Sequence, residues 1–191
     1  MEATADLIAV GCHVERQLDA GLTGLLQLLG ADRGDAGFVG SVADPYRPAR
    51  MAAMPDVATE PFEVAAGDPL VVAVMSTPEP MLVADVCADL TDGPVRDLLV
   101  GNGTRSILVR RLERHDDGCG LVCIDWTDRV PDVPTEALEL VDYFVSRIWS
   151  PMLMRSVTER SPVAGGGVLA QLSAAERSVV ELAATGLSYA E

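Results

Sequence analysis

The chain has 191 residues and carries 14 basic against 29 acidic side chains, which gives a formal net charge of −15 at pH 7. Such a charge repels phosphate backbones and anionic membranes, so these residues alone are expected to bind nucleic acid poorly. A hydrophobic content of 49 % is enough for one domain with a buried core. No apolar run reaches the roughly 18 residues that span a bilayer, and no signal peptide is evident. We therefore expect a cytoplasmic protein with no membrane partner.

The N-terminal part of the chain has the pattern of a helix followed by two strands. A helix is predicted over 3–29, because leucines recur on one face at spacings of four, three and four. These are Leu18, Leu22, Leu25 and Leu29. Gly30 would end that helix, and two strands are predicted over 35–44 and 46–54. Pro48 should shorten the second strand or place it at a sheet edge.

The middle of the chain predicts short elements. Residues 67–76 fit a helix with Asp68 as its N-cap and Pro69 in the first turn. A buried strand stays open there, because the β-branched run LVVAV also suits a strand. A strand is predicted over 80–86 and a short helix, closed by glycines, over 91–103.

A hairpin and a long helix follow. The apolar, β-prone segments 106–113 and 119–126 are joined by RHDDG, and Asp-Gly between two such runs predicts a hairpin. A helix is predicted from Thr135, with Pro151 kinking or breaking it. Its apolar face contains Ala137, Val141, Phe144, Ile148 and Met152. Residues 161–171, small and uncharged with three consecutive glycines, predict a linker.

The last residues, 172–191, contain two capping boxes. Ser173 with Glu176 and Ser188 with Glu191 have the S-x-x-E form in which each side chain caps the other residue's backbone N–H. Gly186 between them suits the left-handed turn that closes a helix. The segment therefore predicts one complete helix and the start of a second.

These residues resemble the LuxR-type helix-turn-helix domain of bacterial transcription regulators. The matching positions are Leu172, Ser173, Glu176, Val179, Leu182, Ala183, Gly186, Leu187, Ser188 and Glu191. Ala175 and Ser178 depart from positions that are usually charged in that family. The resemblance implies a DNA-binding domain whose third helix enters the major groove. We expect the chain to be a fragment without that helix, so that only the full-length protein binds DNA; a natural C-terminus with a coincidental amphipathic helix is the alternative.

The body of the chain, residues 1–160, resembles a GAF domain, the sensor fold often joined to such output domains. The resemblance lies in LLQLLGADRGDAGFVG, where a helix leads into a strand, in the strand PMLVADV, and in RSILVRRL turning into CGLVCIDW. It implies an α+β fold, a central antiparallel sheet flanked by N- and C-terminal helices. PAS-like folds share such a sheet and stay open as an alternative.

The GAF resemblance also implies a small-molecule pocket near residues 67–105. Phe38, Met75 and Met81 are the candidates to line it, with core filling as the alternative. Arg96 is the basic residue that could meet an anionic ligand, unless it simply pairs with Asp92 four residues earlier.

Catalytic and metal-binding patterns are weak in this sequence. Cys119 and Cys123, four apart on one predicted strand, lie on the same face but too far apart to share one ion. Neither His13 nor His115 is near a nucleophile in a catalytic pattern. We therefore expect no enzyme activity, no metal and no cofactor.

The two apolar helix faces suggest how copies of the chain associate. Six residues could form a helical bundle between two protomers, or pack on each chain's own sheet: Leu18, Leu22, Leu25, Val141, Phe144 and Ile148. Since operators are usually read by paired proteins, a homodimer is expected. The sequence thus predicts the sensor portion of a LuxR-type regulator, responding to an unidentified small-molecule or protein signal. A protein-interaction domain without a small ligand is the alternative.

Overall fold

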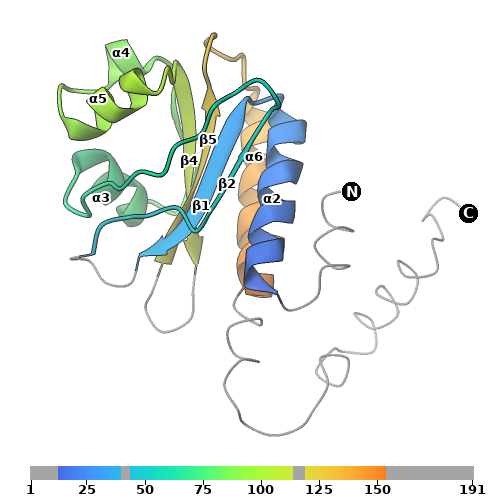
Figure 1. Cartoon of the computed structure of the whole chain (residues 1–191). Helices are drawn as coiled ribbons and strands as arrows, with labels where there is room; N and C mark the ends of the chain where they lie inside the picture. Colours follow the sequence, from blue (N-terminus) through green and yellow to red (C-terminus); the bar gives the residue numbers. More distant parts are fainter. Residues whose placement is uncertain (1–12, 40–43, 114–118, 154–191) are drawn as a thin grey trace, which may run out of the picture.

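An antiparallel sheet of five strands lies between two groups of helices (Figure 1). The computed structural model describes residues 13–39, 44–113 and 119–153. The predicted linker 161–171 and helix-turn-helix segment 172–191 lie outside these described residues. Among the described helices, none combines the length and the apolar character needed to cross a membrane.

The sheet has the strand order β2-β1-β5-β4-β3, and each pair of neighbouring strands is antiparallel. Its strands are β1 (Arg33–Val39), β2 (Arg50–Ala53), β3 (Met81–Val83), β4 (Ser106–Glu113) and β5 (Cys119–Trp126). The hairpin of β4 and β5 has the bounds predicted from the sequence. β1 and β5 form the other long pair, in which Arg33 lies opposite Asp125. This pairing brings an N-terminal strand beside the second strand of the hairpin.

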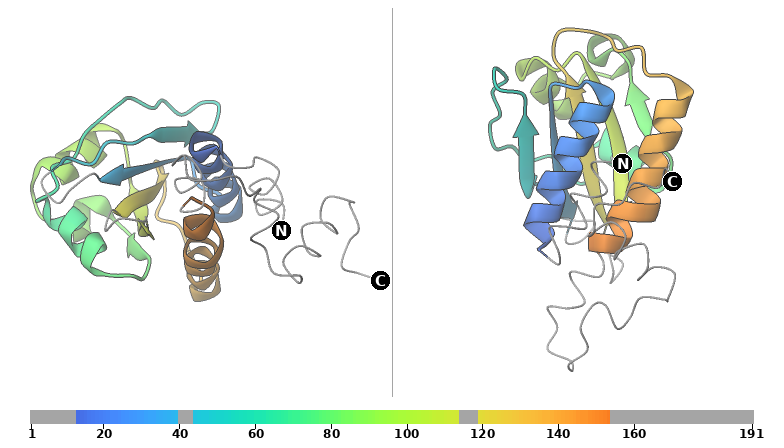
Figure 2. Two further views of the ribbon diagram at one scale, coloured as in Figure 1. Left: turned by 90° about the horizontal axis from the view of Figure 1, so that it is seen from below. Right: turned by 90° about the vertical axis from the view of Figure 1, so that its right-hand side faces the viewer.

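Helices cover both faces of the sheet (Figures 1 and 2). On one face lie α2 (Val14–Leu29) and α6 (Thr135–Tyr143), the latter continued by the π-helix η1 (Phe144–Trp149). On the other face lie α3 (Pro69–Ser76), α4 (Val86–Asp89) and α5 (Pro94–Gly101). The α+β class and the flanking helices predicted from the sequence are therefore confirmed.

The apolar faces of α2 and α6 pack inside the chain. The residues expected either at a dimer seam or on the chain's own sheet are buried or half-buried in one core with β1, β4 and β5. They are Leu18, Leu22, Leu25, Val141, Phe144 and Ile148. The first three are at most 1 % exposed. The structure thus favours the alternative in which these side chains pack on the chain's own sheet.

Gly21 lets the two long helices approach closely. A Cβ atom added at Gly21 would lie 2.2 Å from Cε2 of Trp149, whose side chain is fully buried. The Trp149 indole N–H donates to the carbonyl of Gln17 over 3.0 Å. The indole therefore occupies the place of a side chain on α2, and Gly21 is required by packing.

Pro151 does not break the C-terminal helix. The helix runs through Pro151 to Leu153, the last residue described in this part of the chain. The departure from α-helical geometry comes earlier, where Phe144–Trp149 forms the π-helix and the N–H of Ser150 donates to the carbonyl of Val145. A break at Pro151 is therefore wrong, since the helix is already widened before the proline is reached.

The bounds of the first two strands differ from those predicted. β1 begins at Arg33, and the described part of this strand ends at Val39. β2 begins only at Arg50, after Pro48, and it lies at the edge of the sheet as Pro48 predicted. Tyr46 forms an isolated bridge with Val64 instead of pairing in the sheet. The predicted strand over 46–54 is therefore too long.

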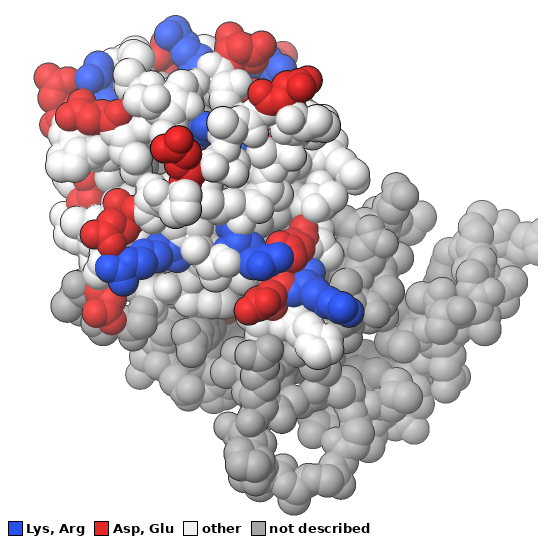
Figure 3. Space-filling view, in the orientation of Figure 1, with Lys and Arg blue, Asp and Glu red and all other residues white. Residues whose placement is uncertain are grey.

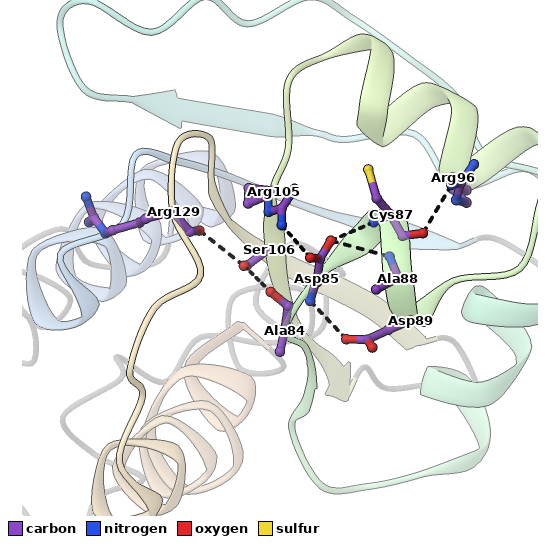
Figure 4. A network of polar contacts seen from close by, with 9 residues as sticks. All are labelled: Ala84, Asp85, Cys87, Ala88, Asp89, Arg96, Arg105, Ser106 and Arg129. Atoms are coloured by element: carbon purple, nitrogen blue, oxygen red, sulfur yellow. Dashed lines mark hydrogen bonds and ion pairs between the residues drawn. The ribbon is translucent and has the colours of Figure 1, made fainter.

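Asp85 ends the strand predicted over 80–86 and starts α4. Its Oδ1 accepts hydrogen bonds from the N–H groups of Cys87 and Ala88, over 3.0 and 3.3 Å (Figure 4). Its Oδ2 lies 2.5 Å from Nη2 of Arg105. These contacts hold the segment that connects β3 to α5, and α5 is one wall of the cavity described below.

Charged side chains of both signs lie close together on the surface. On the face shown in Figure 3, arginines lie beside aspartates and glutamates, with uncharged surface between these groups. Among the described ion pairs, Arg47 lies beside Glu63 and Arg50 beside Asp19, with N–O distances of 2.7 and 2.6 Å. This face therefore presents no broad basic area of the kind that binds a phosphate backbone.

Candidate functional site

A cavity of about 290 Å³ lies between the sheet and the helices α3 and α5. Its walls are mostly aliphatic: Val64, Leu70, Val71, Val74, Val95, Leu98, Leu99, Ile107, Val109 and Leu121. An apolar cavity with a few converging polar groups is the usual form of a small-molecule site.

One wall of the cavity is α3, and the helical alternative predicted for residues 67–76 is confirmed for Pro69–Ser76. Asp68 caps α3 by accepting a hydrogen bond from the N–H of Leu70 over 2.9 Å, and Pro69 occupies the first turn. This helix directs Val71 and Val74 toward the sheet, where both are buried. The exposed Val72, on the same helix, does not line the cavity.

Polar groups reach the cavity from the two central strands. Successive side chains of a strand point to opposite faces, so Arg33 and Asp35 of β1 share a face with Cys123 and Asp125 of β5. The register pairs Arg33 with Asp125 and Asp35 with Cys123. Two acidic side chains therefore lie diagonally across the strands on the floor of an apolar cavity.

Only one of the two carboxylate oxygens of Asp125 has hydrogen-bond partners. Its Oδ2 accepts from Nε of Arg33 and from the hydroxyl of Thr104, both over 3.1 Å. Its Oδ1 is buried and has no hydrogen-bond partner. Burial raises the pKa of Asp125, while Arg33 and the hydrogen bond from Thr104 act against that rise. Asp125, which lines the cavity, thus retains a buried carboxylate oxygen with unused acceptor capacity.

Asp35 is held by Tyr46. The Tyr46 hydroxyl donates to Oδ1 of Asp35 over 2.6 Å, and both side chains are buried. Burial raises the pKa of Asp35 to about 7; the Tyr46 hydrogen bond lowers it, and the charge of Asp125 raises it. A carboxyl group of this kind changes charge near neutral pH.

The cysteines give no evidence of a metal centre. Among the described residues, no group of three or more His, Cys, Asp or Glu side chains is placed to hold a metal ion. Cys87, Cys119 and Cys123 are free thiols. Burial raises the pKa of the Cys123 thiol well above its usual value, as expected of a small buried side chain.

The three apolar side chains predicted to line a pocket lie outside this cavity. Phe38 packs with the core on the opposite face of the sheet, because strand alternation places it with Ala36 and not with Asp35. Met75 and Met81 pack at the edge of the core on the cavity side without lining the cavity. Core filling, the alternative left open, describes all three.

Arg96 also lies outside the cavity. Its Nη1 is 3.0 Å from Oδ1 of Asp92. Its Nη2 donates to the carbonyl of Cys87 over 3.1 Å, a contact shown in Figure 4. The structure therefore shows the i,i+4 ion pair that was the alternative for this residue.

Sequence reasoning missed Asp35 and Asp125, which the structure places at the centre of the site. A signal was present, since each is an acidic residue inside an apolar strand segment, in RGDAGFV and CGLVCIDW. A charged residue that is buried in a strand usually has a specific partner or function.

Comparison with solved structures identifies the fold. The GAF domain of Thermosynechococcus elongatus PixJ, in its blue-light absorbing form, is 11 % identical, with a TM-score of 0.65 over 78 % of this chain and 89 % of that one. The phycoerythrobilin-bound GAF domain of a cyanobacterial phytochrome is 15 % identical, with a TM-score of 0.65 over 83 % and 97 %. A domain described as belonging to a Sinorhizobium meliloti 1021 two-component sensor histidine kinase is 16 % identical, with a TM-score of 0.56 over 74 % and 93 %.

The chain therefore has the fold of GAF sensor domains, as found in phytochromes and histidine kinases. The prediction of a GAF-like body is confirmed at the level of the fold. No protein-family model matches the sequence, and a search of curated proteins found no match.

Proposed function

We propose that this chain is the sensor part of a LuxR-type transcription regulator, in which a small ligand in the cavity changes the activity of a DNA-binding domain. The observation that carries the proposal is the cavity itself. It is lined by α3, α5 and the sheet, and buried polar side chains are among its lining residues. A filled sheet face would have favoured the alternative of a protein-interaction domain. The DNA-binding output is supported by the sequence resemblance of residues 172–191.

The size of the cavity favours a compact ligand. Its volume of about 290 Å³ is near the lower end of small-molecule sites. A linear tetrapyrrole, such as the bilins named for some structural neighbours, is much more extended. We therefore assign no bilin and no other cofactor to this chain, and the proposal includes no catalytic step.

The same proposal includes a homodimer. Because the leucine-rich faces are buried within the chain, the contact would use the outward sides of α2 and α6. Leu28, Leu140 and Tyr143 are 46, 47 and 58 % exposed there. Light scattering on the purified chain should give the mass of a dimer, and Leu140→Glu with Tyr143→Glu should give that of a monomer. A wild-type monomer at tens of micromolar would contradict the dimer.

Two valines on α3 offer a matched test of the cavity as a ligand site. Val71→Phe would place a ring in the cavity, whereas Val72→Phe would place the same ring on the exposed side of the same helix. A fragment library is screened by thermal unfolding against the wild type and both variants. We expect compounds that raise the Tm of the wild type and of Val72→Phe but not of Val71→Phe. Stabilisation that persists in Val71→Phe, or its absence throughout the library, would contradict a ligand-binding cavity.

A further inference from the structure

We propose that the ligand of this cavity is a compact apolar molecule with a positively charged, hydrogen-bond-donating head, such as a primary amine, held between the carboxylates of Asp35 and Asp125. This inference rests on the proposed function of the cavity and adds the chemical class of its ligand. It replaces the anionic ligand that Arg96 had suggested.

The unsatisfied oxygen of Asp125 is the first reason. Buried polar groups in folded proteins nearly always have a hydrogen-bond partner, and one without a partner carries a cost of about 1–3 kcal/mol. Oδ1 of Asp125 is such a group, in a residue that is 6 % exposed and lines the cavity. An acceptor is satisfied only by a donor, so a ligand group that reaches this oxygen must carry N–H or O–H.

The balance of charge in the cavity is the second reason. Three acidic side chains line it, Asp35, Asp125 and the exposed Glu60, against the single arginine Arg33. That arginine is already engaged, because Nε contacts Asp125 over 3.1 Å and Nη2 donates to the Thr104 hydroxyl over 2.6 Å. An anionic ligand would therefore meet repulsion without a free cation, whereas a cationic head would be attracted.

The placement of the two carboxylates is the third reason. Asp35 and Asp125 are diagonal neighbours on one sheet face, and the charge of Asp125 acts on the carboxyl group of Asp35. Opposite them stand the aliphatic side chains of α3 and α5, including Val74 and Leu99. The cavity thus has one polar end and one apolar end, which matches a molecule with a charged head and a hydrocarbon body.

The protonation of Asp35 is consistent with this assignment. Burial and the neighbouring charge of Asp125 raise the pKa of Asp35 to about 7, so this carboxyl group takes up a proton near neutral pH. A bound ammonium group would supply the compensating charge and release that proton. Binding of the cation is therefore expected to weaken as the pH falls below about 7.

Three probes of nearly the same shape test the ligand class: benzylamine, toluene and benzoate. Each is titrated into the chain at about pH 8, above the pKa of Asp35, and followed by the amide chemical shifts of the cavity-lining Val71, Leu99 and Leu121. We expect benzylamine to bind about tenfold or more tightly than toluene, as charge-assisted hydrogen bonds provide. Benzoate should bind more weakly than toluene.

Variants separate the head-group contact from the rest of the cavity. Asp35→Asn and Asp125→Asn should bring the affinity for benzylamine close to that for toluene, while toluene binding is retained. Asp92→Asn, the same change on a residue whose side chain is 95 % exposed and outside the cavity, should leave all three affinities unchanged. Asp35→Asn keeps the acceptor for Tyr46, so it provides the test if Asp125→Asn does not fold.

The outcomes distinguish this inference from the proposed function. Equal binding of toluene and benzylamine, or tighter binding of benzoate, would overturn the cationic ligand and leave a ligand-binding cavity in place. If no probe shifts the cavity amides, including toluene, the cavity does not admit small molecules and the proposed function fails with it, because apolar cavities of smaller size bind benzene.

Discussion

Tyr46 and Asp35 are eleven residues apart in the sequence and meet at the floor of the cavity, where the tyrosine hydroxyl donates to the carboxylate over 2.6 Å. Tyr46 is 1 % exposed, and its backbone is held by the bridge with Val64. One buried hydrogen bond therefore joins the loop before β2 to the central strand β1.

Tyr46→Phe should lower the free energy of unfolding by about 1–3 kcal/mol at neutral to mildly alkaline pH, because it removes a hydrogen bond to a buried carboxylate. Urea unfolding followed by the fluorescence of the buried Trp126 and Trp149 measures this change. Ser76→Ala is the control, since it removes an exposed hydroxyl that donates to the carbonyl of Val72, and it should change stability by less than about 0.5 kcal/mol. Equal effects of the two substitutions would contradict a structural role for the Tyr46 hydroxyl.

Asp35 should make the protein less stable as the pH rises from about 4 to about 7. Its pKa is raised from 3.8 to about 7 in the folded state, so in this window the native state holds a proton that the unfolded state has lost. The stability that protonated Asp35 contributes is fully present below the pKa of the unfolded state. It is lost as the pH rises through the pKa of the folded state. A pKa difference of this size between the folded and unfolded states corresponds to at most about 4 kcal/mol in the free energy of unfolding.

The substitution Asp35→Asn isolates this dependence. The variant should unfold with a flatter pH profile between about 4 and 7 and should be more stable than the wild type at about pH 8. Asp92→Asn should retain the wild-type slope. Chemical unfolding of the three proteins at a series of pH values provides the measurement, and parallel profiles for wild type and Asp35→Asn would refute the assignment.

Arg33 and Arg96 should differ strongly in their contribution to stability. The ion pair of Arg33 with Asp125 is almost buried, with side-chain exposures of 11 and 8 %. Arg33→Met leaves a buried carboxylate without its cation and should cost about 3–5 kcal/mol. Arg96→Met breaks a pair in which Asp92 is 95 % exposed and should cost less than about 1 kcal/mol. Denaturant midpoints of the two variants compare these values directly; similar losses would show that burial does not distinguish the pairs.

Gly21→Ala should destabilise the protein, although alanine favours helices more than glycine does. Its Cβ atom would lie 2.2 Å from the Trp149 ring, and overpacking of this kind costs about 1–3 kcal/mol. Thr23→Ala, on the exposed side of the same helix, should be neutral or slightly stabilising. The Tm of each variant is the readout, and a stabilised Gly21→Ala would mean that Trp149 does not rest on α2.

Elements with strong local signals were predicted well. The β4–β5 hairpin has the predicted bounds, Asp68 and Pro69 begin α3, and Gly30 adopts the left-handed conformation that ends α2. The predicted secondary structure is wrong where a short polar side chain caps a helix or where tertiary packing changes the backbone. Asp85 converts the end of a predicted strand into the cap of α4, and the helix continues through Pro151 after a π-helical stretch.

The candidate site was predicted poorly for a different reason. A pocket near 67–105 was expected, and α3 and α5 do form its walls. Its polar floor, however, comes from β1 and β5, and the Arg33–Asp125 contact joins residues separated by 92 positions. The residues that surround Arg33 and Asp125 in the sequence do not indicate that these two side chains meet. The apolar character of Phe38 likewise does not show which face of the sheet its side chain occupies.

Periodicity, capping residues and turn chemistry act within a few residues of one another, so the chain alone was sufficient for the kinds of elements, their order and the α+β class. Strand pairing and register join residues that are distant in sequence, and they set which side chains share a face. The partnership of Asp35 with Asp125, the burial that raises the pKa of Asp35, and the intramolecular packing of the leucine-rich helices follow from that register and from the close approach of α2 to Trp149. These features exist only once the sheet has assembled, because burial and Coulomb interactions depend on distance in space and not on distance along the chain.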